Sequence, residues 1–95
     1  MDIDTCIFRH CEKDMVGVAI HPIKSGDWVN VLDMDSQEKF PIKVKDDIPL
    51  FHKVALRDIS QNADVIEYGQ VIGSAIEGIL AGEYVHVHNI RTKRW

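Results

Sequence analysis

"VAIHPIKSGDWV" (residues 18–29), "VALRDISQNADV" (residues 54–65) and "SAIEGILAGEYV" (residues 74–85) align with one another without a gap. Each segment begins with a small residue, Ala and an aliphatic residue. An Ile, a Gly or Asn, and a Val then follow at intervals of three positions. The segments start at irregular intervals along the chain, which argues against a solenoid. The pattern therefore predicts one structural unit that is used three times.

A strand, a turn and a second strand explain this unit. The first strand ends at the aliphatic residue, and the Ile that follows plugs the turn into the core: Ile23, Ile59 and Ile79. The next marked position is expected to need a positive φ, which Gly adopts freely and Asn tolerates best among other residues: Gly26, Asn62 and Gly82. A short helix closed by Gly82 is the alternative for "SAIEGILAG".

The rest of the chain also favours strands. On a strand, "WVNVLDMD" would place Trp28, Asn30, Leu32 and Met34 opposite Val29, Val31 and Asp33. Pro41 is typical of an edge strand or of the start of a strand, and Asp46-Asp47 is interpreted as a solvated turn. Short strands with close turn signals and no long helical period indicate an all-β fold. We expect one compact domain over residues 1–95. The further strand candidates are residues 5–10, 28–35, 40–45 and 64–69.

The charge of the chain excludes several functions. The formal net charge is -4 and the isoelectric point is near 5.6, whereas nucleic-acid and anionic-membrane binding need a basic surface. No apolar run reaches the roughly 18 residues of a membrane span. The acidic start "MDIDTCIF" lacks the basic region of a signal peptide. We therefore expect a cytoplasmic protein in which Cys6 and Cys11 are reduced thiols.

The segment "YVHVHN" (residues 84–89) concentrates polar rings near the C-terminus. On an extended strand, alternation would place Tyr84, His86 and His88 on one side, with the two imidazoles roughly 6.6 to 7 Å apart. Two imidazoles at that separation can flank a small anion or share a metal ion, although a structural zinc site needs four ligands. An exposed polar strand face explains the same pattern, so the residues alone leave both interpretations open.

Other polar residues give weaker indications. His52-Lys53 offers an acid or base beside an ammonium that can hold a carboxylate, or only a surface dipeptide at the start of a strand. His10 and His21 stand alone and are expected at the surface. The chain contains no GxGxxG, P-loop, GxSxG or HExxH motif. Residue chemistry alone thus leads to a small all-β domain with a polar histidine face.

From "IPLFHKVALRDI" (residues 48–59) through "IEYGQVIGSAIEGILAGEYVHVHN" (residues 66–89) the chain resembles the N-terminal SAF-type domain of the altronate and galactarate dehydratase family. The small subunit of sulfolactate sulfo-lyase is similar. The family pattern reads approximately Ile-Pro, Gly-His-Lys-Val-Ala-Leu, Lys-Tyr-Gly, Ile-Gly and Gly-Glu-x-Val-His-x-His-Asn. Residues 14–33 match the opening of the pattern more loosely. Together these motifs are specific, and they cover nearly the whole chain.

Two positions depart from the family pattern. Phe51 replaces the Gly expected before His52, and a bulky side chain there would restrict the approach of a ligand to the backbone. Glu67 replaces the Lys expected before Tyr68, which reverses a charge where an acidic substrate would be held. Both departures lie at positions that bear on the identity of the substrate.

The resemblance implies a β-clip fold and a small subunit of a lyase that dehydrates a sugar acid of the altronate or galactarate type. It implies that catalytic groups come from His52, His86 and His88. It implies that substrate is bound by Lys53, Tyr68 and Asn89. Because fused members continue beyond the position of Asn89, this chain is expected to pair with a separate large catalytic subunit and to be inactive alone.

Several alternatives stay open. The chain is otherwise the small subunit of sulfolactate sulfo-lyase, which eliminates sulfite, or a non-catalytic module that binds a carbohydrate or a partner. The sequence assigns no cofactor to this chain and identifies no metal ligands. The resemblance implies a divalent metal, iron or manganese, in the large subunit. Self-association into a homo-oligomer is a further expectation when that subunit is absent.

Overall fold

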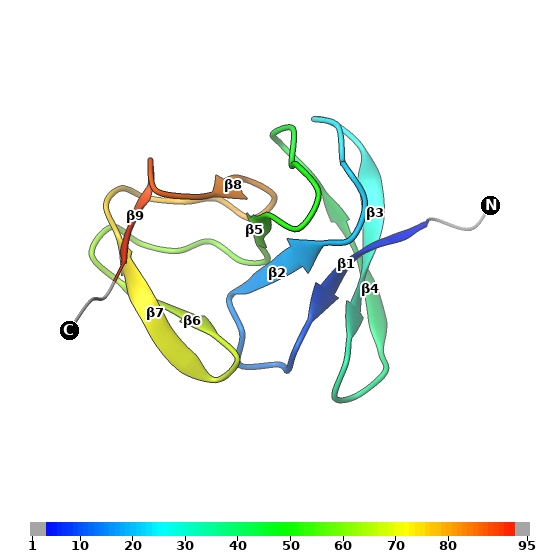
Figure 1. Ribbon diagram of the computed structural model, residues 1–95, viewed down its shortest axis with the longest axis horizontal. Helices are drawn as coiled ribbons and strands as arrows, with labels where there is room; N and C mark the ends of the chain where they lie inside the picture. Colours follow the sequence, from blue (N-terminus) through cyan, green and yellow to red (C-terminus); the bar gives the residue numbers. More distant parts are fainter. Residues whose placement is uncertain (1–3, 93–95) are drawn as a thin grey trace.

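Nine β-strands and no helix make up residues 4–92, the part of the chain that the computed structural model describes (Figure 1). The predicted all-β fold class is confirmed. No segment in this range is a helix long and apolar enough to cross a membrane. The strands are β1 (Thr5–Arg9), β2 (Val16–Ala19), β3 (Trp28–Asp33), β4 (Lys39–Lys43), β5 (Lys53–Ala55), β6 (Asp64–Glu67), β7 (Gln70–Ala75), β8 (Tyr84–Val85) and β9 (Ile90–Thr92).

The strands form two sheets. A six-stranded sheet has the order β4-β3-β1-β2-β5-β8, and a three-stranded sheet has the order β6-β7-β9. Only β1 and β3 pair in parallel among these strands. Pro41 lies on β4, an edge strand as predicted, where its missing N–H removes no ladder hydrogen bond. In Figure 1 the β6-β7 hairpin lies at the opposite end of the molecule from β3 and β4.

The three predicted turns share one backbone geometry. The φ angles are 94° at Gly26, 71° at Asn62 and 92° at Gly82, which confirms the predicted positive φ. Each unit has the same turn hydrogen bond, from Asp27 N to Lys24 O (3.1 Å) and at the corresponding positions of the other two units (3.0 Å each). The helical alternative for residues 74–82 is wrong, because this segment holds the end of β7 and a turn.

The Ile of each unit is buried, as predicted. Ile23, Ile59 and Ile79 are each at most 4% exposed. Ile59 and Ile79 also form an isolated bridge with each other, and Ile23 forms one with Ile48. The backbone N–H groups of each bridge donate in both directions, so the turns are tied together by hydrogen bonds as well as by apolar contact. The apolar Ile therefore fixes where each turn docks.

Two apolar clusters make up the core, and strand β5 contributes to both. Val54 belongs to the cluster around Ile7 and Val31, whereas its neighbour Ala55 belongs to the cluster around Val65. Successive side chains of a strand point to opposite faces. This short strand therefore lies between the two clusters and contributes a side chain to each. This arrangement also brings β8 beside β5.

Candidate functional site

Four rings gather at the junction of β5 and β8. Tyr84 lies in the middle, with its ring centroid 5.6 Å from His52, 5.5 Å from His86 and 5.6 Å from His88. The centroids of His52 and His86 are 5.3 Å apart. The planes of Tyr84 and His86 are stacked within 6°. We call these four residues the ring cluster, and it unites the three predicted catalytic histidines.

Strand pairing explains why the rings meet. Strands β5 and β8 are antiparallel, with Lys53 opposite Val85 and Val54 opposite Tyr84. His52 precedes β5 and His86 follows β8, so the same register places these two residues next to each other. The convergence of His52 with the two C-terminal histidines therefore follows from the pairing of the second and third repeat units.

The segment after β8 is a turn and not the extended strand that alternation predicted. Strand β8 ends at Val85, and residues 86–89 turn back before β9. Asn89 is 4% exposed and closes the turn, because its Oδ1 accepts from His86 N (3.0 Å) and its Nδ2 donates to Tyr84 O (2.7 Å). A polar side chain that satisfies the backbone locally competes with strand pairing. The side chain of Asn89 thus holds the ring cluster in place.

Lys53, which follows His52 in the chain, brings a positive charge to this region. Its Nζ lies 3.7 Å from Glu67 Oε1, at the end of β6. Burial raises the pKa of Glu67, the Lys53 ammonium opposes that rise, and the Asp14 carboxylate adds to it. Glu67 therefore reaches Lys53 and offsets part of its charge. Lys53 nevertheless shares a surface cavity with His52 and His86.

Tyr68 lies apart from the ring cluster. Its ring packs against His10, with 4.9 Å between centroids, and its backbone N donates to Asp14 Oδ2 (2.9 Å). It lines a different surface cavity, together with Phe8 and Met34. Among the predicted substrate-binding residues, Lys53 is beside the histidines and Asn89 supports them from within the turn. Because Tyr68 lines a different cavity, it would contact the same ligand only if that ligand extended across the surface between the two cavities.

Two residues that shape the site have no predicted role in the sequence. The alternation of residues 84–88 indicates on which side Tyr84 lies but not its function, although its hydroxyl is 2.5 Å from His52 Nδ1. Asp46, interpreted as solvated, accepts a hydrogen bond from Tyr84 N (2.9 Å). Asp47 likewise accepts from Ser25 N (2.9 Å). The alternation of residues 84–88 indicates that Tyr84 lies with the histidines. The adjacent carboxylates Asp46 and Asp47 give no indication that Asp46 bonds the backbone of Tyr84.

The departure at Phe51 has a backbone consequence. Phe51 has a φ of 66°, in the left-handed region that Gly favours, and the family pattern has Gly at this position. Its side chain is 71% exposed and lines the cavity beside His52. Val87, 70% exposed, lines the same cavity. Two exposed apolar side chains therefore flank the ring cluster.

Comparisons with known proteins identify the family of the chain. The model of the altronate/galactarate dehydratase SAF domain matches residues 6–93. The chain is 40% identical to the (2R)-sulfolactate sulfo-lyase subunit alpha of Chromohalobacter salexigens, over the full length of both chains. It is 37% and 42% identical to the altronate dehydratases of Bacillus subtilis and Escherichia coli. Those matches cover 85% and 83% of this chain but 15% of each dehydratase. The chain therefore belongs to the altronate/galactarate dehydratase SAF domain family.

Proposed function

We propose that the chain is the small subunit of a lyase that eliminates a β-leaving group from a 2-hydroxy acid, and that the ring cluster completes an active site on a large subunit. The observation that carries the proposal is the convergence of His52, Tyr84, His86 and His88 where β5 and β8 pair. Relatives named as lyase and dehydratase support the reaction class.

The cluster has groups suited to this chemistry. Elimination removes the proton on C2 and the leaving group on C3, and the resulting enol tautomerises to a 2-keto acid. An imidazole is suited to accept and return such a proton. The hydroxyl of Tyr84 at His52 Nδ1 gives that ring a fixed partner, and the Lys53 ammonium would attract the carboxylate of the acid.

(2R)-Sulfolactate is the first substrate to test. The relative that this chain matches from end to end is named as a subunit of (2R)-sulfolactate sulfo-lyase. Altronate is the second candidate, because the identity to an altronate dehydratase reaches 42%. The two reactions differ at the leaving group, since sulfite departs as a stable anion whereas hydroxide needs a proton from a general acid.

A divalent metal would be held by the large subunit in this proposal. Among residues 4–92, the ring cluster does not bring three metal-ligand atoms within reach of one another, so its histidines fit a role in proton transfer or substrate contact better than a complete metal site. Bound on the large subunit, the ion would polarise the substrate as a Lewis acid. The rings of this chain would then act beside it.

The large subunit would also cover Phe51 and Val87. Both side chains are exposed beside the cluster, and apolar residues around a polar centre are typical of an interface. The isolated chain would therefore present an incomplete and open site. We infer that it has no turnover alone and that its exposed rim favours self-association.

Co-expression with the subunit that accompanies the Chromohalobacter alpha subunit tests the proposal. We expect the two chains to co-purify, and we expect the complex to release sulfite from (2R)-sulfolactate. Formation of a 2-keto acid from altronate, assayed in parallel, separates the two substrates. Turnover by the isolated chain would refute the shared site. A complex that forms and acts on neither acid would refute the substrate class.

A further inference from the structure

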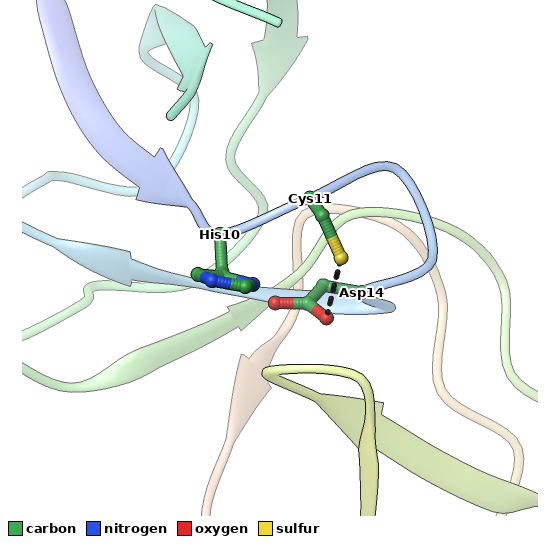
Figure 2. A group of neighbouring side chains, drawn as sticks. All are labelled: His10, Cys11 and Asp14. Carbon is green, nitrogen blue, oxygen red and sulfur yellow. Dashed lines mark hydrogen bonds between the residues drawn. The ribbon is translucent and has the colours of Figure 1, made fainter. Parts of the chain in front are cut away.

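The loop between β1 and β2 brings together three side chains of different metal-binding chemistry. Figure 2 shows His10, Cys11 and Asp14 side by side in this loop. One ligand atom from each residue lies within 4.8 Å of the other two. Cys11 Sγ is 3.6 Å from Asp14 Oδ1, with the thiol as the donor. No other group of three such residues occurs between residues 4 and 92.

Contacts from outside the group hold these side chains in position. The loop is closed by a hydrogen bond from Asp14 N to Cys11 O (3.0 Å). The buried Asp14 carboxylate accepts from Tyr68 N (2.9 Å) and Gly69 N (3.0 Å), in the turn between β6 and β7. The ring of His10 packs on that of Tyr68. Such supporting contacts orient the ligands of a metal before it binds.

We propose that His10, Cys11 and Asp14 form a binding site for a divalent transition-metal cation, with Zn²⁺ as the best fit. Zinc accepts nitrogen, sulfur and carboxylate oxygen in one tetrahedral site, whereas Mg²⁺ and Ca²⁺ select oxygen alone. Three protein ligands leave one position for water or another small ligand, unlike a structural site with four. The proposal is independent of the lyase function.

Binding involves an exchange of a proton for a metal. The S–H bond of Cys11 breaks, a bond between Sγ and the metal forms, and the proton passes to solvent without any change in oxidation state. Asp14 Oδ1 then loses the thiol as a donor and has a lone pair free for the cation. A cation bound between the thiolate and the carboxylate would also offset the repulsion between their negative charges.

Asp14 has a structural role without a metal, because its carboxylate anchors the β6–β7 turn. That role does not account for the His10 and Cys11 side chains beside it. The bonds from Tyr68 N and Gly69 N need only the carboxylate. A thiol is a weak donor to that carboxylate, and His10 is exposed. Variants of Cys11 and His10 therefore test the metal site while the anchor stays in place.

Titration of the tag-free chain with Co²⁺, under a reductant that contains no thiol, tests the site. We expect one equivalent to bind, with a thiolate-to-cobalt charge-transfer band and release of a proton, and we expect Zn²⁺ to displace it. Cys11→Ser should remove the band. Cys6→Ala, which removes the chain's other cysteine from a buried position, should keep it. A band that survives Cys11→Ser, or no band at all, overturns the proposal.

The histidine and carboxylate ligands have their own controls. His10→Ala should weaken Co²⁺ binding by about tenfold or more, since even the loss of a residue that only supports a metal ligand weakens binding by about that much. Asp14→Asn, which keeps an oxygen to accept from Tyr68 N, should weaken it similarly in a chain whose circular dichroism is unchanged. His88→Ala, in the ring cluster, should leave binding unaltered. Unchanged affinity in His10→Ala, or a loss in His88→Ala alone, places the metal elsewhere and overturns the site.

Discussion

The hydroxyl of Tyr84 lies 2.5 Å from Nδ1 of His52, although 32 positions separate the two residues in the chain. The antiparallel pairing of β5 with β8 creates this contact, because Val54 lies opposite Tyr84. One ring nitrogen of His52 is thereby engaged, so Tyr84 holds the orientation of the ring. In the proposed active site, Nε2 would be the atom that faces the substrate.

Tyr84→Phe should lower the turnover of the reconstituted complex by about 10²-fold, because the ring remains but the hydrogen bond to His52 is lost. The ratio of kcat/KM for the variant and the wild type measures the effect. A shift confined to KM would instead assign the hydroxyl to substrate binding. His21→Ala, at an exposed position outside the site, is the control and should change neither constant.

His86→Ala should also lower turnover by about 10² or more, the usual scale for loss of a proton-transfer residue. His86 stacks on Tyr84, so the complex must be shown to form normally by gel filtration before rates are compared. An unchanged rate in an intact complex would make His86 only an exposed polar residue of the turn.

Phe51→Gly should stabilise the isolated chain slightly. The left-handed backbone at Phe51 costs roughly 1 to 2 kcal/mol for a residue with a side chain, and the added freedom of Gly in the unfolded chain offsets about 0.5 to 1 kcal/mol of that. Urea denaturation should report a gain between zero and about 1.5 kcal/mol. Association with the large subunit should weaken, since an exposed aromatic ring is lost. A marked loss of stability would show that Phe51 packs in the fold.

Three glycines form a graded series for Gly→Ala substitution. Gly78 has open space around it and an ordinary φ, so Ala should be neutral or stabilise by about 0.5 kcal/mol. Gly26 has open space but a φ of 94°, and Ala should cost about 1 to 2 kcal/mol. At Gly82 an added Cβ would also meet the Lys43 carbonyl, so Ala should cost more than at Gly26. Thermal denaturation tests the order, and equal effects would contradict it.

Stability should fall in acid partly through Asp33. The backbone N–H of Ser36 is the largest cause that lowers the pKa of Asp33, burial opposes it, and Arg9 and the N–H of Asp35 lower it further. Because the folded pKa lies below the unfolded one, this group stabilises the fold above the unfolded pKa of about 4 and loses its effect as pH falls through the folded value.

Asp33→Asn should therefore flatten the loss of stability between about pH 5 and pH 2. Urea denaturation at a series of pH values measures the slope. Asp35→Asn, an exposed carboxyl on the same turn, is the matched control and should leave the slope close to that of the wild type. An identical slope in Asp33→Asn would assign the acid sensitivity to other carboxyls.

Local sequence pattern predicted the turns because their causes are local. Gly26, Asn62 and Gly82 mark positions where only the backbone of one residue matters, and the buried Ile of each unit follows from simple hydrophobicity. The alternation of "WVNVLD" likewise matches the observed burial of β3. The family pattern added the histidines, and the pairing of β5 with β8 brings them together.

The remaining features depend on contacts that spacing does not reveal. The end of β8 at Val85 is decided by the side chain of Asn89, which bonds the backbone of its own turn. The role of Asp46 depends on an N–H that is 38 positions away. The division of the core into two clusters depends on which face each residue of β5 presents, and three residues carry too little periodicity to show it.

Strand β5 has a consequence for how the molecule opens. Val54 and Ala55 are adjacent, yet each is fully buried in a different cluster. Disruption of either cluster frees the strand on which the other one depends, so partial unfolding of one half is suppressed. Amide protons of β2 and β5 should accordingly exchange with solvent only through global unfolding. Cooperativity in this small protein thus depends on one shared strand of three residues, since neither half retains a closed core without it.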